Sequence, residues 1–173
     1  MNISNQNKKL IKNSAIIALG TIITKFINFL MVPFYTEWLS PEEYGKFDLV
    51  STYVFLAVSI STLQLEQALY RFTLDEPKKS NKYFNEICKF LTPIILLLSF
   101  IMLLCIYYFN LPAYTYIAII YYISIIYYTL CVEYIRGLKK LKLYSLINIL
   151  SGSIIVLFNF IFVKLYSLST FGM

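Results

Sequence analysis

The sequence contains no histidine, few cysteines and little charge, and each shortage excludes a class of protein. Without any His among its 173 residues, the chain lacks the commonest general base and metal ligand. The three cysteines, Cys88, Cys105 and Cys131, are odd in number and lack CxxC spacing, so they predict neither a disulfide framework nor a zinc site. We therefore expect no metal centre, no cofactor and no soluble catalytic chemistry.

Charged residues make up only 14% of the chain, whereas 59% of its residues are hydrophobic. A soluble domain of this length needs a more polar surface. Apolar runs of about 20 residues can each cross a hydrocarbon core roughly 30 Å thick, and continuous rather than alternating runs favour helices over a barrel. The predicted fold class is therefore all-α, a polytopic membrane protein with about five transmembrane helices. The predicted spans cover about 13–35, 47–72, 87–109, 114–135 and 143–165.

Most of the 15 Lys and Arg residues lie on every second connector between these runs. They precede the first span and follow the second and the fourth: Lys8, Lys9, Lys12; Arg71, Lys78, Lys79, Lys82, Lys89; Arg136, Lys139, Lys140, Lys142. By the positive-inside rule, this alternation predicts a cytoplasmic N-terminus. The net charge of +6 is then explained by residues that set topology and contact anionic lipid headgroups, and nucleic acid is not an expected partner.

The connectors predict two local features. Ser40-Pro41-Glu42-Glu43 is typical of the start of a short helix in the first outer loop, with Ser40 as the cap and acidic residues in the first turn. The polar segment 73–86, which contains Pro77, predicts an interfacial turn or short helix on the cytoplasmic side.

Lys25 lies deep within the first predicted span. An ammonium at the bilayer centre costs about 2.5–3.5 kcal/mol on insertion scales, so a charge retained there should face water, a partner or a charged substrate. Thr21, Lys25 and Asn28 fall on one side of a helix.

Polar residues also recur at helical spacing on the second and fifth predicted spans. We therefore predict that helices one, two and five line a polar cavity, with helices three and four outside. The predicted cavity residues are Thr21, Lys25, Asn28, Ser59, Thr62, Glu66, Asn148 and Asn159. The alternative for the hydroxyl and amide groups is that they bond neighbouring backbone or helices, at about 0.6 kcal/mol for each pair.

Several motifs resemble the N-terminal part of bacterial polysaccharide exporters. The first is Lys12-Asn13-Ser14 followed by Ala18-Leu19-Gly20, and the second is the loop Leu39-Ser40-Pro41-Glu42-Glu43-Tyr44-Gly45-Lys46-Phe47. The others are Glu66-Gln67-Ala68-Leu69-Tyr70-Arg71-Phe72 and the pair Arg136-Gly137. On these residues the chain is similar to the polysaccharide transport family of the multidrug/oligosaccharidyl-lipid/polysaccharide exporter superfamily.

The resemblance implies a flippase that moves undecaprenyl-diphosphate-linked oligosaccharide from the inner to the outer leaflet of the bacterial cytoplasmic membrane by alternating access. It implies that the chain is a partial N-terminal bundle that needs a C-terminal bundle in cis or in trans. Lys25 would meet the lipid diphosphate, and Arg71 and Arg136 would form a cytoplasmic gate or contact headgroups. The expected partners are the lipid-linked oligosaccharide, membrane lipids and a coupling ion.

Three alternatives stay open. A cation-coupled drug exporter of the same superfamily would use acidic cavity residues, chiefly Glu66. A membrane glycosyltransferase would use outer-loop carboxylates, but the loop that carries Glu37, Glu42, Glu43 and Asp48 is short for a catalytic platform. A gene fragment or natural truncation is the third, because residues 167–173 look like the opening of a further span.

Overall fold

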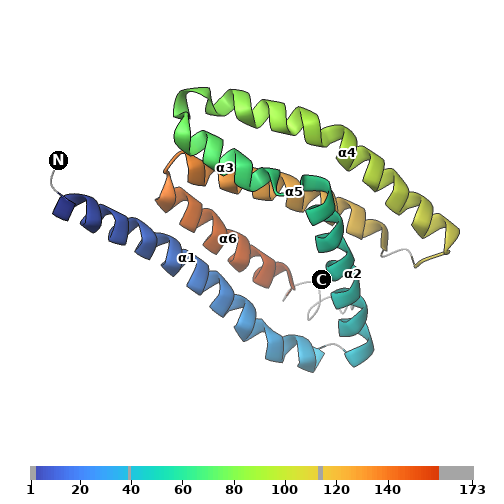
Figure 1. The fold of residues 1–173 in the computed structure, drawn as a ribbon. Helices are drawn as coiled ribbons and strands as arrows, with labels where there is room; N and C mark the ends of the chain where they lie inside the picture. Colours follow the sequence, from blue (N-terminus) through green and yellow to red (C-terminus); the bar gives the residue numbers. More distant parts are fainter. Residues whose placement is uncertain (1–2, 39, 113–114, 160–173) are drawn as a thin grey trace. The chain divides into compact units, whose positions relative to one another are not determined.

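The computed structural model describes residues 3–38, 40–112 and 115–159, and within these ranges the chain is helical with no strand (Figure 1). The elements are α1 (Ile3–Trp38), α2 (Pro41–Thr62), α3 (Leu65–Asp75), the short 3-10 helix η1 (Pro77–Lys79), α4 (Ser80–Tyr108), α5 (Thr115–Gly137) and α6 (Leu141–Asn159). In the described part of the chain, four helices are long and apolar enough to cross a membrane, or up to five if α2 and α3 together form one bent span. The predicted all-α polytopic membrane fold is therefore confirmed.

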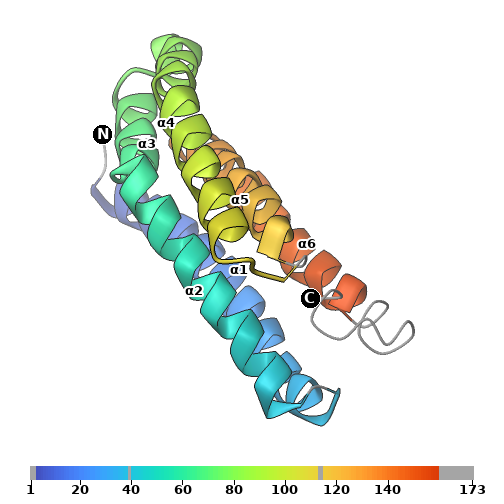
Figure 2. The ribbon, with the colours of Figure 1, turned by 90° about the vertical axis from the view of Figure 1, so that its right-hand side faces the viewer.

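The chain divides into two compact units. Unit 1 comprises residues 1–44 and 140–173, and unit 2 comprises residues 45–139. Within unit 1, α1 packs along α6 (Figures 1 and 2). A methyl group added at Gly20 would lie 2.8 Å from Ser145 Oγ, and one added at Gly152 would lie 3.3 Å from Thr24 Cγ2. The two glycines therefore let α1 and α6 approach closely.

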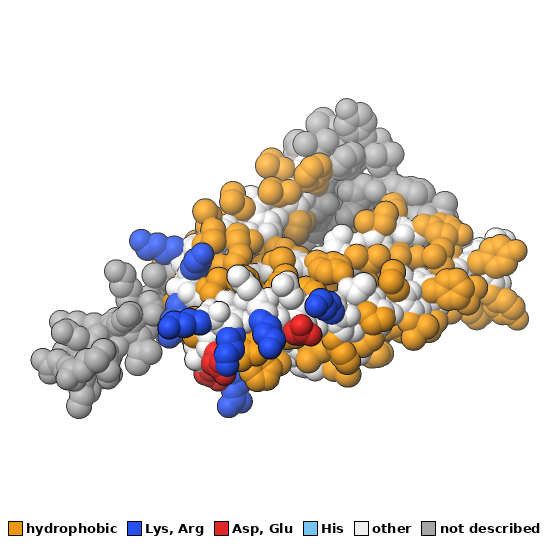
Figure 3. Space-filling model, turned by 90° about the horizontal axis from the view of Figure 1, so that it is seen from above, with side chains coloured by type: hydrophobic (Ala, Val, Ile, Leu, Met, Phe, Trp, Pro, Cys, Tyr) orange, Lys and Arg blue, Asp and Glu red, His pale blue; other side chains and the backbone are white. Residues whose placement is uncertain are grey.

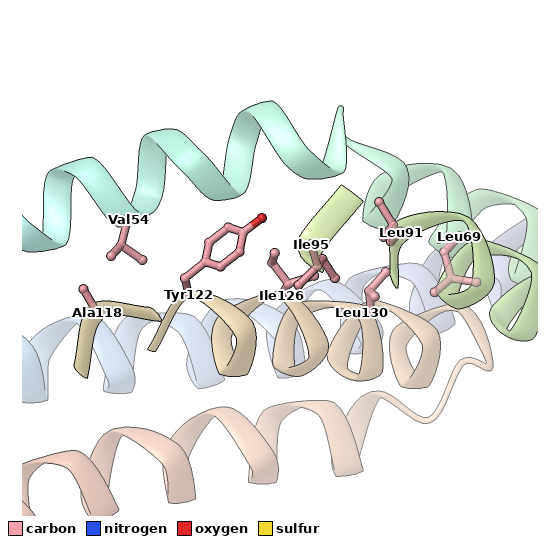
Figure 4. Close-up of a cluster of buried hydrophobic side chains, with 8 residues drawn as sticks. All are labelled: Val54, Leu69, Leu91, Ile95, Ala118, Tyr122, Ile126 and Leu130. Carbon is pink, nitrogen blue, oxygen red and sulfur yellow. The ribbon is translucent and has the colours of Figure 1, made fainter. Parts of the chain in front are cut away.

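Unit 2 is organised around α5, which packs against both α3 and α4. One face of α5 is buried at every fourth residue, so that a single stripe along the helix contacts its neighbours. The core consists of Val54 from α2, Leu69 from α3, Leu91 and Ile95 from α4, and Ala118, Tyr122, Ile126 and Leu130 from α5 (Figure 4). Tyr122 is fully buried and its hydroxyl bonds Ser61 of α2.

The third predicted helix is α4, and only part of its surface is free of protein contacts. Leu91 and Ile95 are buried in the core, whereas Leu96, Leu97 and Phe100 are exposed. From Pro93 to Cys105 its almost wholly apolar sequence therefore suits both the packed face and the exposed face, because lipid and protein core are equally apolar.

The predicted helix start at Ser40 is confirmed, and its contacts form a capping box. The Ser40 amide donates to Glu43 Oε2 at 3.0 Å, and the Glu43 amide donates to Ser40 Oγ at 3.3 Å. The sequence predicted a short helix here, separate from the span that begins near residue 47. The structure instead continues as one helix from Pro41 to Thr62.

The second predicted span is divided in the structure. Between α2 and α3 the chain breaks at Leu63 and Gln64, whose φ angles are 45° and 64°, and the two helices are bent by 50°. Side chains other than glycine cost about 1–3 kcal/mol each in this left-handed region. Gln64 is the N-cap residue of α3, and its side chain makes no cap hydrogen bond.

The polar connector between α3 and α4 forms the predicted turn with a short helix, η1. Lys79 Nζ lies 2.7 Å from Glu76 Oε2, and hydrogen bonds from Lys79 and Tyr83 hold the pKa of Glu76 below its usual value. The Tyr134 hydroxyl on α5 donates to Asn81 and lies 3.5 Å from Ser80 Oγ, so the end of α5 is tied to the start of α4. On the face seen in the space-filling view, Lys and Arg side chains gather in one region, and hydrophobic side chains cover much of the rest of the described residues (Figure 3).

The left-handed break predicts opposite effects of glycine at two glutamines of the same segment. Gln64→Gly should raise the stability of the chain by about 1 kcal/mol, because glycine adopts positive φ without strain. Gln67→Gly, inside α3, should lower it by about 1 kcal/mol. The midpoint of unfolding in mixed detergent and SDS, followed by circular dichroism, measures both. Equal losses from the two substitutions would contradict the left-handed conformation at Gln64.

The bend between α2 and α3 is compatible with two membrane topologies: the two helices form one broken span, or they form a re-entrant loop. We expect a broken span, because the connector that follows α3 carries Lys78 and Lys79 and should lie on the cytoplasmic side. In a chain freed of its native cysteines, a membrane-impermeant maleimide added from outside should label Lys46→Cys but not Lys78→Cys in intact cells. Labelling of both positions from the same side would favour the re-entrant loop.

Candidate functional site

In unit 1, α1 presents Lys25 on an exposed surface of an apolar helix. Lys25 lies within the candidate span Ile17–Phe34, and no acidic side chain pairs with it in the described part of the chain. Thr21, one turn earlier, is also exposed, and its hydroxyl donates to the Ile17 carbonyl at 3.0 Å. The α6-facing side of α1 is formed by Gly20 and Thr24 instead. Lys25 and Thr21 therefore lie on a surface of α1 different from the one that packs against α6.

Of the three asparagines predicted to line the cavity in unit 1, the structure describes the side chain of only one. The side chains of Asn28 and Asn159 lie outside the described part of the structure, and Asn148 is half-buried on α6. Gly152, which falls on the same predicted face of α6 as Asn148, packs against Thr24 of α1. At Gly152, the face of α6 that includes Asn148 therefore packs against α1.

In unit 2, the predicted cavity residues of α2 differ in exposure. The Ser59 hydroxyl is exposed and donates to the Phe55 carbonyl at 3.0 Å, which is a local helix contact. Thr62 is only 1% exposed, and its Oγ1 has no hydrogen-bond partner among the described residues. A buried hydroxyl without a partner lowers stability by about 1–3 kcal/mol. The end of α2 therefore carries a buried polar group at Thr62 that could accept or donate a hydrogen bond.

The charged residues of unit 2 converge where α3 packs against α5. The Arg136 guanidinium donates to both carboxylate oxygens of Glu133, at 3.1 and 3.0 Å, and it lies 4.2 Å from the centre of the Tyr70 ring. These side chains are largely shielded, with 28% of Arg136 and 12% of Glu133 exposed. Glu66 lies one turn before Tyr70 on α3, and its Oε2 atom is buried without a hydrogen-bond partner among the described residues. We call Glu66, Tyr70, Glu133 and Arg136 the α3–α5 charge cluster.

The structure thus places Glu66 on α3 and Arg136 at the end of α5, two predicted site residues on helices that pack against each other. The third predicted residue of this region, Arg71, is exposed. Sequence reasoning missed Glu133 and Tyr70. The signal for Glu133 was present, because an acid and an arginine three positions apart lie on the same face of a helix. The contribution of Tyr70 follows only from the packing of α3 on α5.

The acidic residues around the connector between α1 and α2 form no comparable constellation. Glu42 and Glu43 occupy the first turn of α2, where Glu43 completes the capping box, and Glu37 and Asp48 are exposed. Among the described residues, no group of three or more Asp, Glu and Cys side chains is placed to hold a metal ion.

Comparison with known proteins supplies one match. The model of a family described as "Polysaccharide biosynthesis protein" matches residues 10–171. No curated protein and no solved structure matches the chain.

Close packing at the charge cluster makes Gly137 sensitive to substitution. A methyl group there would lie 2.7 Å from Thr73 Cβ and 3.0 Å from the Tyr70 carbonyl oxygen. Gly137→Ala should therefore lower stability by about 1–3 kcal/mol through overpacking. The matched control is Gly45→Ala, which meets nothing within 4 Å and should stabilise α2 by about 0.5–1 kcal/mol. Unfolding in detergent compares the two variants, and a neutral Gly137→Ala would argue against the close approach of α3 and α5.

Proposed function

Because the chain belongs to the family of polysaccharide biosynthesis proteins, we propose that it acts in flipping a lipid-linked oligosaccharide across a membrane. The coarser statement, that it is a multi-pass membrane protein of polysaccharide biosynthesis, follows from the family match and the apolar helices. The finer statement is that the substrate is an undecaprenyl-diphosphate-linked oligosaccharide that moves from the inner to the outer leaflet. The membrane is then the bacterial cytoplasmic membrane.

The observation that carries this proposal is the exposed ammonium of Lys25 within an apolar span. Such a charge is costly in lipid, at about 2.5–3.5 kcal/mol on insertion scales, unless it meets water or an anion. A diphosphate supplies the opposite charge and several acceptor oxygens. In our proposal Lys25 faces a hydrated cavity and binds the diphosphate during passage, with Thr21 and Asn28 on the same side of α1.

Arg71 and Arg136 have different roles in the proposal. Arg71 is exposed. It lies on α3 after Glu66 and Tyr70, near the connector that carries Lys78 and Lys79, and in this position it is suited to contact lipid headgroups. Arg136 is bound by Glu133 and stacked on Tyr70, so its charge is already balanced by protein. Arg136 therefore serves as a gate element, and a phosphate would have to displace Glu133 to reach it.

Alternating access needs a second bundle against which this one moves. The proposal therefore includes a C-terminal bundle, in the same polypeptide or in another, and a coupling ion that drives the cycle. Glu66, one of the proposed cavity residues, offers the acidic group that cation coupling requires.

Replacing Lys25 tests the proposal in cells that depend on this protein for surface polysaccharide. Lys25→Ala and Lys25→Glu should lower export about tenfold or more, since a charge-assisted hydrogen bond is worth about 1.5–3 kcal/mol. Lys25→Arg should retain more export because it keeps the charge. Lys46→Ala, on the outer connector, is the matched control. Undiminished polysaccharide at normal protein level in Lys25→Ala would refute the assignment.

A further inference from the structure

Unit 2 contains an apolar cavity between α2, α4 and α5. Its volume is about 230 Å³, and its lining includes Val50 and Val54 of α2, Met102 and Ile106 of α4, and Ala118 of α5. Val54 and Ala118 face each other between α2 and α5 (Figure 4). All of these residues belong to unit 2, so the cavity is defined by one compact unit alone.

The bend between α2 and α3 accounts for the cavity. α3 packs against α5 and α4, and α2 is bent away from α3 by 50° at Leu63 and Gln64. Near the bend α2 is joined to α5, where Ser61 bonds Tyr122, but toward its start it separates from α4 and α5 (Figures 1 and 2). The described side chains do not fill the space that results. Because protein interiors contain few voids larger than a water molecule, a space of this size requires an occupant.

The lining favours hydrocarbon over water. Its surface is almost wholly apolar, and polar groups at its edge are bound within the protein: the Thr115 hydroxyl donates to the Pro112 carbonyl at 2.6 Å, and the Ile106 carbonyl accepts from the Leu111 amide at 3.0 Å. A buried water needs two to four polar partners, whereas an apolar cavity of about 150 Å³ stays dry and binds benzene. In proportion to the six carbons of benzene, the cavity of about 230 Å³ holds a hydrocarbon segment of roughly nine carbons.

The cavity has an exposed rim at a depth that lipid chains cross. Tyr53 and Leu111 in the lining are 66% and 43% exposed, whereas Ile106 is buried. α4 and α5 are candidate membrane spans, so the medium at this rim is the bilayer. Met102 and Ile106 lie within six residues of Tyr108, where α4 ends, which places them within about 9 Å of the helix end at 1.5 Å per residue. The cavity therefore lies just inside one membrane surface, where acyl chains begin.

We propose that this cavity binds an acyl chain of a membrane phospholipid, which fills the gap between α2, α4 and α5. The phospholipid headgroup stays at the membrane surface, so the cavity needs no charged group, and none of the described lining residues is charged. A polyprenyl chain shares the apolar chemistry, but Lys25, the residue proposed to bind its diphosphate, belongs to unit 1 and contributes nothing to the lining. The bound lipid would support α2 after the bend.

Photo-crosslinking of the full chain in bilayers of phosphatidylethanolamine and phosphatidylglycerol tests this proposal. The probe is a phosphatidylethanolamine that carries a diazirine on one acyl chain, and mass spectrometry locates the adducts. Adducts should be enriched several-fold at Val50, Met102 and Ile106 relative to Leu96 and Leu97, which are exposed on α4. The physical reason is that a chain held in the cavity stays longer than a chain that exchanges freely along an exposed helix face.

Filling the cavity should displace the lipid chain. Val50→Phe adds volume from α2 and should lower the adducts at Met102 several-fold. The matched control is Leu49→Phe, at an exposed neighbouring position of α2 that does not line the cavity, and it should leave the adducts unchanged. Met102→Phe fills the cavity from α4, with Leu97→Phe as its control, and is read from the adducts at Val50. Circular dichroism first verifies that each variant keeps the helix content of the wild type.

Wild-type adducts at the lining no more abundant than those at Leu96 and Leu97 would overturn the proposal, and this result needs no variant. Adducts that Val50→Phe and Met102→Phe both leave unchanged would overturn it as well. Unlabelled polyprenyl phosphate should compete no better than the same amount of unlabelled phosphatidylethanolamine, and stronger competition would assign the cavity to a polyprenyl chain instead. The site does not rest on the proposed function, so Lys25→Ala should keep the adducts even if it abolishes export.

Discussion

Hydrocarbon offers no hydrogen bonds, and this constraint governs every polar feature of the chain. A helix satisfies its own backbone in lipid, so an interruption or an ionised side chain must be covered by other protein groups or by water. The interruption at Leu63 and Gln64 lies between α2 and α3, and both helices pack in unit 2 around α5. The acids of unit 2 follow the same rule, since Glu133 is held by Arg136. The ion pair of Arg136 and Glu133 therefore lies where α5 packs against α3.

The cluster between α3 and α5 differs in kind from Lys25. Arg136 is held by Glu133 and by the ring of Tyr70, so both its charge and its orientation are fixed by the fold. Lys25 is exposed on α1, and no acidic group pairs with it among the described residues. A fixed arginine suits a structural gate, whereas a cation with a flexible stem suits a ligand that must bind and leave. The two sites therefore fit different steps of the proposed transport cycle.

Local sequence rules predicted the features that depend on local chemistry. The helix start with Ser40 as its cap and the turn in the segment 73–86 could both be predicted, because caps and proline act over a few residues. The break in the second span was not, because neither glycine nor proline marks Leu63 and Gln64. The charge cluster also depends on packing, since Tyr70 and Arg136 are distant in sequence and meet only when α3 packs on α5. The close approach of α6 to α1 at Gly152 likewise depends on packing, because it involves Thr24 of a helix distant in sequence.

The close pairing of α1 with α6 has a consequence for synthesis. The two helices are the first and last of the described chain, and the whole of unit 2 lies between them. α1 must therefore leave the ribosome and enter the membrane long before its packing partner exists. Until α6 has been synthesised, Gly20 lacks its contact with Ser145. During this time Lys25 lies on a helix that has no packing partner in unit 1. During this interval the Gly20 face of α1 is covered by groups other than α6.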